Sequence, residues 1–230
     1  MTERYNRQIM IPEIGEEGQQ KIRKAKVLLI GAGGLGSPIA TYLTGAGIGK
    51  LGIVDDDVVD VTNLHRQVLY SEEQTGLKKA ECAKQRLRQL NSEVEIEAYP
   101  YRLTAGNAEE LIRDYDIVVD GMDNFATRYI VSDVCQRLHK PFVYGAIRAM
   151  EGQVAVLCKG ERNYRSLFPD EQEMLRMPHP GKAVLPTTPA VVGSVEACQV
   201  LLLAAGFGSP LIDKLWTIDL ATMESMVIDL

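Results

Sequence analysis

The chain alternates short runs of apolar and β-branched residues with longer segments in which apolar positions recur at helical spacing. Such alternation is typical of an α/β fold, in which helices on both faces cover a largely parallel sheet. No internal repeat, low-complexity run or linker divides the chain. We therefore expect one domain over residues 1–230, with an N-terminal helical arm at residues 1–24.

The expected elements follow an order that builds such a sheet. Five strands should form its parallel part, at residues 26–30, 51–54, 94–99, 116–120 and 141–144. Helices should follow the first four, at residues 38–43, 78–90, 107–113 and 124–138. Antiparallel C-terminal strands and an apolar helix should complete a mixed sheet, at residues 152–157, 214–219 and 224–228 and at 190–205. Residues 159–188 carry several prolines and little periodicity, which predicts a functional or mobile loop.

A glycine-rich turn, GAGGLG, lies directly between the first expected strand and the first expected helix. It fits the pattern G-x-G-x-x-G, whose glycines permit close backbone approach and whose helix N-terminus offers N–H groups to phosphate. An aspartate ends the second strand, 19 residues after the last glycine, where it can accept hydrogen bonds from ribose hydroxyls. These features predict a nucleotide site in a Rossmann-like fold, formed by Gly31, Gly33, Gly34, Gly36 and Asp55. The same glycines would also suit a plain turn that packs a helix on a strand.

Two basic residues downstream of this turn favour ATP over NAD as the nucleotide. Arg66 lies in the segment Asn63-Leu-His-Arg66-Gln67, and Lys79 begins a helix. A dehydrogenase has no need for cations at this end of its nucleotide. A triphosphate site needs them, because it must neutralise the β- and γ-phosphates and the departing pyrophosphate. The alternative is that Arg66 and Lys79 are solvated surface charges.

The segment Asp120-Gly-Met-Asp123-Asn124 follows the fourth strand, at the edge of an open α/β sheet where ligands bind. Asp123 could therefore hold Mg²⁺ through oxygen ligation. It could instead cap the following helix, and Asp120 would then be the alternative magnesium ligand.

Charge and cysteine content limit the partners. A net charge of −6 and a pI of about 5.2 argue against nucleic acid. The N-terminus lacks the apolar core of a signal peptide. The apolar stretch at residues 190–205 is expected to be too polar to span a membrane. The chain has four cysteines without C-x-x-C spacing: Cys82, Cys135, Cys158 and Cys198. They should be reduced residues of a cytoplasmic protein. Cys158 and Cys198 are also expected to lie in the core.

Taken in order along the chain, these motifs resemble the bacterial relatives of ubiquitin-activating enzymes, the HesA/MoeB/ThiF family of sulfur-carrier adenylyltransferases. The resemblance covers essentially the whole chain. The matching motifs are Arg4-Tyr5-x-Arg7-Gln8, Gly31–Gly36, Asp55-x-Asp57, Asn63-Leu-x-Arg66-Gln67, Gly76-x-x-Lys79, Asp123-Asn124 and Arg148-x-x-Glu151-Gly152-Gln153.

The resemblance implies an activity and roles for individual residues. The family uses ATP and Mg²⁺ to adenylate the C-terminal Gly-Gly carboxylate of a small ubiquitin-like sulfur carrier, for thiamine or molybdenum-cofactor biosynthesis. By this resemblance Asp55 and Asp57 would serve the ribose end, and Asp123 would hold Mg²⁺. The residues implied at the phosphates are Asn63, Arg66, Gln67 and Lys79. Arg7 would reach the nucleotide of a second subunit, which makes a homodimer part of the site.

Two departures from the family pattern matter. The usual zinc site uses two C-x-x-C pairs, but Asn163 and Ser166 occupy the first and nothing matches the second. We therefore expect no zinc. No cysteine lies in residues 176–184, where some relatives carry a thiol that takes the activated carrier, so a covalent step on this protein is not expected.

Three alternatives stay open at this point. An NAD-dependent oxidoreductase would use the same glycines and Asp55 but lacks a persuasive hydride-transfer site. A non-catalytic relative that only binds a ubiquitin-like protein would have no reason to keep Arg66, Lys79 and Asp123 together. A relative could also adenylate another carboxylate, such as a peptide C-terminus.

Overall fold

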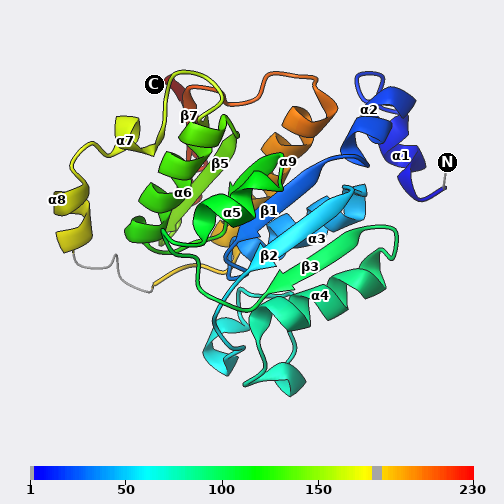
Figure 1. The fold of residues 1–230 in the computed structure, drawn as a ribbon, viewed down its shortest axis with the longest axis horizontal. Helices are drawn as coiled ribbons and strands as arrows, with labels where there is room; N and C mark the ends of the chain where they lie inside the picture. Colours follow the sequence, from blue (N-terminus) through cyan, green and yellow to red (C-terminus); the bar gives the residue numbers. More distant parts are fainter. Residues whose placement is uncertain (1–2, 178–182) are drawn as a thin grey trace.

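One eight-stranded sheet crosses the molecule in the order β3-β2-β1-β4-β5-β6-β7-β8 (Figure 1). The computed structural model describes residues 3–177 and 183–230. Five neighbouring strands are parallel: β3 (Glu95–Tyr99), β2 (Lys50–Val54), β1 (Lys26–Ile30), β4 (Ile117–Asp120) and β5 (Phe142–Arg148). The other three pair antiparallel: β6 (Glu151–Leu157), β7 (Lys214–Asp219) and β8 (Glu224–Asp229). The expected mixed, largely parallel sheet is confirmed.

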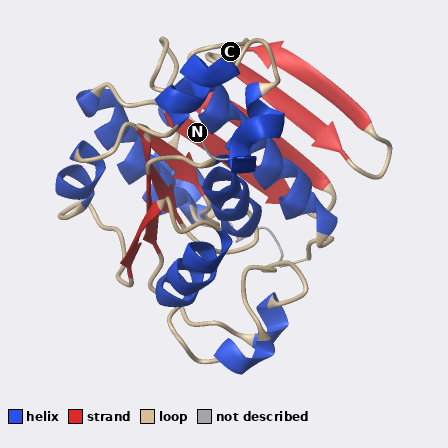
Figure 2. Cartoon of the chain, turned by 90° about the vertical axis from the view of Figure 1, so that its right-hand side faces the viewer, coloured by secondary structure: helices blue, strands red, loops and turns tan. Residues whose placement is uncertain are grey.

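Helices cover both faces of this sheet (Figure 2). One face packs against α2 (Gly15–Ile22), α3 (Gly36–Ala46), α4 (Lys79–Leu90) and α9 (Thr187–Ala205). The other packs against α5 (Ala108–Arg113) and α6 (Phe125–Leu138). Shorter helices lie between these elements: η1 (Glu3–Tyr5), α1 (Asn6–Ile9), η2 (Val61–Asn63), η3 (Glu72–Gln74), α7 (Tyr164–Leu167) and α8 (Glu171–Arg176).

The order of the strands creates a switch point between β1 and β4. The chain builds outward from β1 through β2 to β3, then crosses back to add β4 and β5 on the other side of β1. In open α/β sheets ligands bind at the carboxyl ends of the strands beside such a reversal, because the flanking loops diverge there. The glycine-rich turn after β1 and the segment after β4 meet at this point.

The N-terminal arm is helical, as expected, but its first turn is not simply solvated. Tyr5 is 2% exposed, and a Cβ built on Gly47 would lie 2.4 Å from the tyrosine ring. Its hydroxyl accepts a hydrogen bond from Asn91 Nδ2 at 2.8 Å. Tyr5 is buried because Gly47 leaves space for its aromatic ring. Met10, farther along the arm, is 71% exposed.

The chain after β6 differs most from expectation. The predicted loop at residues 159–188 contains α7 and α8, and Tyr164 in α7 is fully buried. Part of that loop, residues 178–182, lies outside the described residues, and its mobility stays a prediction. The following helix, α9, begins at Thr187 rather than at Ala190, since Pro189 is tolerated in a first helical turn.

The packing of α9, rather than its polarity, decides its role. By length and composition α9 is apolar enough to cross a membrane, which contradicts the expectation from sequence. Half of its most apolar window is nevertheless buried, and it packs against α2, α3, β5 and β6. Cys198, expected in the core, lies on its exposed side. These contacts are those of a helix that covers a sheet.

Candidate functional site

Three glycines allow the turn after β1 to touch the segment after β4. Gly31 has a φ of +92°, and a Cβ there would lie 2.5 Å from the carbonyl oxygen of Gly121. A Cβ on Gly121 would lie 2.1 Å from the Gly31 oxygen, and one on Gly36 would lie 2.2 Å from the same atom. Because these obstacles are backbone atoms, no larger residue fits. The glycines therefore allow close contact between the turn at residues 31–36, here called the phosphate loop, and residues 120–124, here called the Asp123 segment.

The first turn of α3 faces the loop without a side-chain cap from the described residues. Gly33 and Gly34 precede the helix, and the Gly33 carbonyl accepts hydrogen bonds from the Ser37 amide and hydroxyl. An uncapped helix N-terminus carries unpaired N–H groups and a positive dipole end, which together favour a phosphate. The position of this N-terminus agrees with the predicted nucleotide site.

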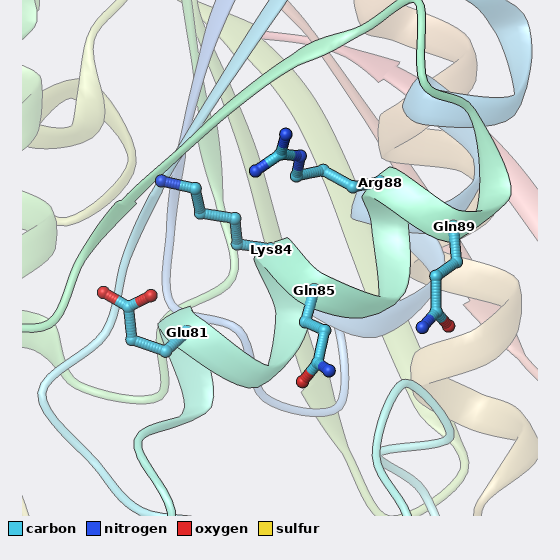
Figure 3. Close-up of a pocket in the computed structure, with 5 residues that line it drawn as sticks. All are labelled: Glu81, Lys84, Gln85, Arg88 and Gln89. Atoms are coloured by element: carbon cyan, nitrogen blue, oxygen red, sulfur yellow. The ribbon is translucent and has the colours of Figure 1, made fainter.

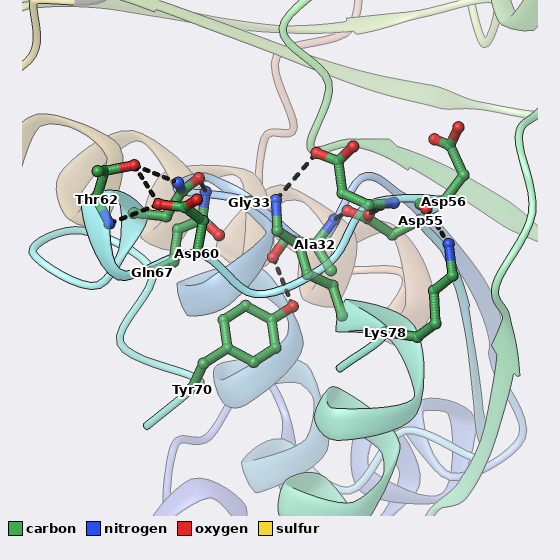
Figure 4. Close-up of polar contacts among 12 residues, drawn as sticks. Ala32, Gly33, Asp55, Asp56, Asp60, Thr62, Gln67, Tyr70 and Lys78 are labelled. Atoms are coloured by element: carbon green, nitrogen blue, oxygen red, sulfur yellow. Dashed lines mark hydrogen bonds and ion pairs between the residues drawn. The ribbon is translucent and has the colours of Figure 1, made fainter. Parts of the chain in front are cut away.

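Asp55 lies at the end of β2 beside the loop (Figure 4). Its Oδ2 accepts a hydrogen bond from the Ala32 amide at 2.7 Å, and its Oδ1 accepts one from the Asp57 amide at 2.9 Å. Burial raises the pKa of this carboxyl, while these two amides and Lys79 oppose the rise. Each oxygen keeps a lone pair, so a fixed carboxylate of this kind suits ribose hydroxyls.

Lys79 is a buried cation at the start of α4. It is only 4% exposed, and its Nζ lies 3.1 Å from Asp57 Oδ2, whereas the Asp57 side chain is 70% exposed. A lysine at a helix N-terminus opposes the helix dipole and so does not serve the helix itself. The alternative of a solvated surface charge is wrong for Lys79. Its burial beside Asp55 and Asp57 suits a cation directed at an anionic ligand.

The segment after η2 docks on the phosphate loop through two side chains (Figure 4). Tyr70 donates from its hydroxyl to the Ala32 carbonyl at 2.8 Å. Gln67 is 3% exposed and donates from Nε2 to Asn63 Oδ1 at 2.8 Å, close to Gly33. Its Oε1 is buried without a hydrogen-bond partner among the described residues. A buried polar atom left unpaired beside the loop suits a site completed by a ligand.

Arg66 runs alongside the loop from the same segment. Its Nη1 donates to the Thr62 carbonyl at 3.4 Å, and its Cδ lies 3.6 Å from the position of a Cβ on Gly34. Pro189, in the first turn of α9, also approaches Gly34, with its Cβ 3.3 Å from that same position. The structure therefore places the Arg66 stem against the phosphate loop, while Arg66 as a whole stays partly exposed.

Asp123, rather than Asp120, is the carboxylate presented to solvent beyond β4. Asp120 is fully buried, and its Oδ2 lies 2.7 Å from Arg128 Nε. Asn124, not Asp123, caps α6 by accepting from the Thr127 amide at 3.0 Å. Asp123 is exposed, with no hydrogen bond or ion pair to residues 3–177 or 183–230. The alternative of a capping Asp123 is therefore wrong, and the burial of Asp120 against Arg128 argues against Asp120 as the magnesium ligand.

The exposed Asp123 carboxylate fits Mg²⁺ bound together with a nucleotide. Among the described residues there is no group of three or more metal-ligating side chains. Mg²⁺ in nucleotide sites is commonly held by one or two carboxylates together with phosphates and water, so Asp123 alone suffices on the protein side.

The two residues at the positions of the first expected zinc-binding cysteine pair have a structural role. Asn163 and Ser166 form the capping box of α7, with Asn163 Oδ1 3.1 Å from the Ser166 amide.

Arg7 is the predicted site residue that the structure does not bring to this edge. It lies in α1, between Tyr5 and Gln8, which contact Gly47 and the Ala46 carbonyl at the far end of α3. An 11-residue helix separates that end from the phosphate loop by about 16 Å at 1.5 Å per residue. Arg7 therefore lies too far from the phosphate loop of the same chain to contact a nucleotide bound there.

Sequence reasoning missed the supporting residues Tyr70 and Arg128. Arg128 donates to Asp120, to the Met122 carbonyl at 2.7 Å and to the Gly145 carbonyl at 3.0 Å. These bonds tie the Asp123 segment to β5. Its spacing of eight residues from Asp120 carries no motif, so only the fold reveals the contact.

A shallow hollow on the surface lies along α4 alone and is separate from this site (Figure 3). It is lined by Glu81, Lys84, Gln85, Arg88 and Gln89.

Several known proteins are similar in sequence to this chain. The sulfur carrier protein adenylyltransferase of Thermus thermophilus is 47% identical over 224 residues, which cover 94% of this chain and 83% of that protein. The adenylyltransferase and sulfurtransferase MOCS3 of Anopheles gambiae is 46% identical over 200 residues, 86% of this chain and 45% of that one. A probable molybdopterin-synthase adenylyltransferase of Porphyra purpurea is 41% identical over 212 residues, 90% and 55%. The chain spans about half the length of the last two.

Solved structures support the fold. Escherichia coli MccB with ATP superposes with a TM-score of 0.84 at 23% identity, covering 100% of this chain and 72% of that one. PaaA superposes with a TM-score of 0.83 at 22% identity, covering 99% and 72%. The model of the ThiF family matches residues 5–230, nearly the full length. With that match and a relative 47% identical over most of its own length, the chain belongs to the ThiF family.

Proposed function

We propose that this protein uses ATP and Mg²⁺ to adenylate the C-terminal Gly-Gly carboxylate of a small ubiquitin-like sulfur-carrier protein. The observation that carries the proposal is the convergence of an uncapped helix N-terminus, a fixed carboxylate at Asp55 and a buried Lys79 at one edge of the sheet. The names of the ThiF relatives, as sulfur carrier protein and molybdopterin-synthase adenylyltransferases, supply the class of substrate.

In the proposed reaction a carboxylate oxygen of the carrier bonds to the α-phosphorus of ATP. The bond from that phosphorus to the α–β bridging oxygen breaks, and pyrophosphate leaves with the electron pair. No general base is required, because the attacking carboxylate is already ionised at neutral pH. Catalysis then consists of positioning and charge stabilisation.

The chain's own residues divide this work. Asp55 and Asp57 orient the ribose, while the glycines of the loop and the α3 N-terminus hold the phosphates. Lys79 and Arg66 stabilise the charge that builds on the departing pyrophosphate, with Asn63 and Gln67 beside them. Mg²⁺, held by Asp123, would neutralise phosphate oxygens.

The position of Arg7 argues for a homodimer. Because Arg7 lies at the opposite end of α3 from its own phosphate loop, it would contact only the nucleotide of a second subunit. The exposed Met10 and Ile11 on the same arm supply apolar surface for such a contact. We further propose that the protein acts in the cytoplasm without zinc, without nucleic acid and without a membrane.

Nucleotide binding separates this proposal from an NAD-dependent oxidoreductase. Mg·ATP should raise the melting temperature of the protein, because a ligand that binds only the folded state stabilises it, and NAD should not. Lys79→Met should remove most of the ATP-induced shift. Lys84→Met, on an outer position of the same helix, is the matched control and should keep it. A shift with NAD but none with Mg·ATP would overturn the proposal.

A further inference from the structure

Glu196, in α9, is a completely buried acid that the proposed reaction does not use. It has 0% exposure, and neither carboxylate oxygen has a hydrogen-bond partner among the described residues. An ionised carboxylate without partners costs far more to bury than a neutral polar group. The fold therefore favours the protonated acid at this position.

The carboxyl group lies against the backbone of β5. A Cβ on Gly145 would stand 2.2 Å from Glu196 Cδ and 2.4 Å from both oxygens, so the missing side chain of Gly145 makes the space. The carbonyl of the same glycine accepts a hydrogen bond from Arg128 Nη2 at 3.0 Å. Glu196 from α9 and Arg128 from α6 thus meet at one residue of the sheet.

The charges around Glu196 are already balanced. The titratable groups whose charges act on Glu196 are Asp120 from β4, Arg128 from α6 and Tyr144 from β5. Asp120 and Arg128 form a buried pair of net zero charge, 2.7 Å apart. Burial and Asp120 raise the pKa of Glu196 well above its usual value, and Arg128 only partly opposes this. An ionised Glu196 would leave one uncompensated negative charge that competes for Arg128.

We propose that Glu196 is held as an uncharged carboxylic acid and acts as a positioning residue for the Asp123 segment. Because it adds no charge, Arg128 remains bonded to Gly145 and to the Met122 carbonyl, one residue before Asp123. The positioning role rests on the proposed function of Asp123, whereas the charge state does not.

The charge state is tested first, by comparing Glu196→Gln with the wild type. In the unfolded chain the carboxyl ionises above about pH 4.3, while in the folded protein it stays protonated to higher pH. The folded state then binds more protons, so wild-type stability falls with rising pH relative to the variant. The ratio of their folding constants should grow by up to about tenfold per pH unit across that window. The exposed control Glu13→Gln should run parallel to the wild type.

Infrared spectroscopy gives an independent reading of the same proton. The wild type at pH 7 should show a protonated-carboxyl C=O band that Glu196→Gln removes and Glu13→Gln retains. Parallel stability curves for Glu196→Gln and the wild type, with no such band, would show that Glu196 is ionised and would overturn the proposal.

The positioning role is tested by the Mg²⁺ concentration that half-saturates ATP-induced thermal stabilisation. Glu196→Gln keeps the shape and neutrality of the acid and should leave this concentration close to that of the wild type. Glu196→Ala and Gly145→Ala should each raise it several-fold, because the first empties the space and the second fills it. If Glu196 had a purely structural role, these two variants would lower the melting temperature and leave the half-saturating Mg²⁺ concentration unchanged. That result would refute positioning. If the wild type itself gave no ATP-induced shift, the proposed function would fail, while the infrared and pH results would still decide the charge.

Discussion

Two identical substitutions at opposite ends of α3 should change stability in opposite directions. Gly36 begins this helix and Gly45 lies near its end, and neither has a positive φ. A Cβ on Gly36 would lie 2.2 Å from the Gly31 carbonyl oxygen, whereas nothing lies within 4 Å of a Cβ on Gly45. The substitution is the same at both sites, but only at Gly36 does the added methyl group meet a backbone atom.

The structure sets the size of each effect. Alanine in an exposed helix interior is favoured over glycine by about 0.8–1.0 kcal/mol, and Gly45→Ala should gain roughly that amount. Overpacking costs about 1–3 kcal/mol, and Gly36→Ala should lie at the upper end, because its obstacle is backbone rather than a flexible side chain. The two variants should thus differ by about 3–4 kcal/mol, or roughly 6–16 °C in melting temperature at 2–4 °C per kcal/mol for a chain of this size.

Urea unfolding with and without Mg·ATP checks both stability and binding. Gly36→Ala should also lose ATP-induced stabilisation, since relief of the clash moves the Gly31 peptide and with it the phosphate loop. Gly45→Ala should keep that stabilisation in full. A Gly36→Ala protein as stable as Gly45→Ala, with normal ATP stabilisation, would refute the assigned role of the glycine contacts.

Three further predictions follow from the same contacts. Arg128→Met should cost about 3–5 kcal/mol in urea unfolding, because it strands the buried Asp120, and adding Asp120→Asn should recover more than half of that; additive losses would contradict the pairing. Arg7→Ala and Asp123→Ala homodimers should each be nearly inactive, and their heterodimers should regain up to about half of the activity, since one of two sites is intact; heterodimers that form without recovery would exclude Arg7 from the partner's site. Elemental analysis of the purified protein should find well under one zinc per chain, and stoichiometric zinc would mean that ligands other than cysteine hold it.

Sequence patterns predicted the elements around the phosphate loop well. The strand before the loop, the helix after it and Asp55 all occur as expected, because a buried strand and a glycine-rich turn have strong local signals. The antiparallel pairing of the last three strands was also confirmed. The roles of Lys79 and Asp123 in nucleotide chemistry came from motif order and stay predictions.

Features set by tertiary contact were not predictable. Nothing local marks Tyr5 as buried, since the space it fills is made by Gly47 far along the chain. Asp120 and Asp123 look alike in sequence, yet Arg128 removes the first from the site and leaves the second exposed. In the sequence Glu196 only interrupts an apolar helix, and its burial depends on the space that Gly145 leaves.

The central claim, adenylation of a carrier's carboxylate, is tested most directly by exchange of labelled pyrophosphate into ATP. The exchange should appear only when a Gly-Gly-tailed ubiquitin-like carrier is added, and a carrier without its tail should give none. Asp123→Ala should abolish exchange without unfolding the protein, because Asp123 is exposed and bonds to no described residue. A folded protein that binds ATP but gives no exchange with any such carrier would contradict the account.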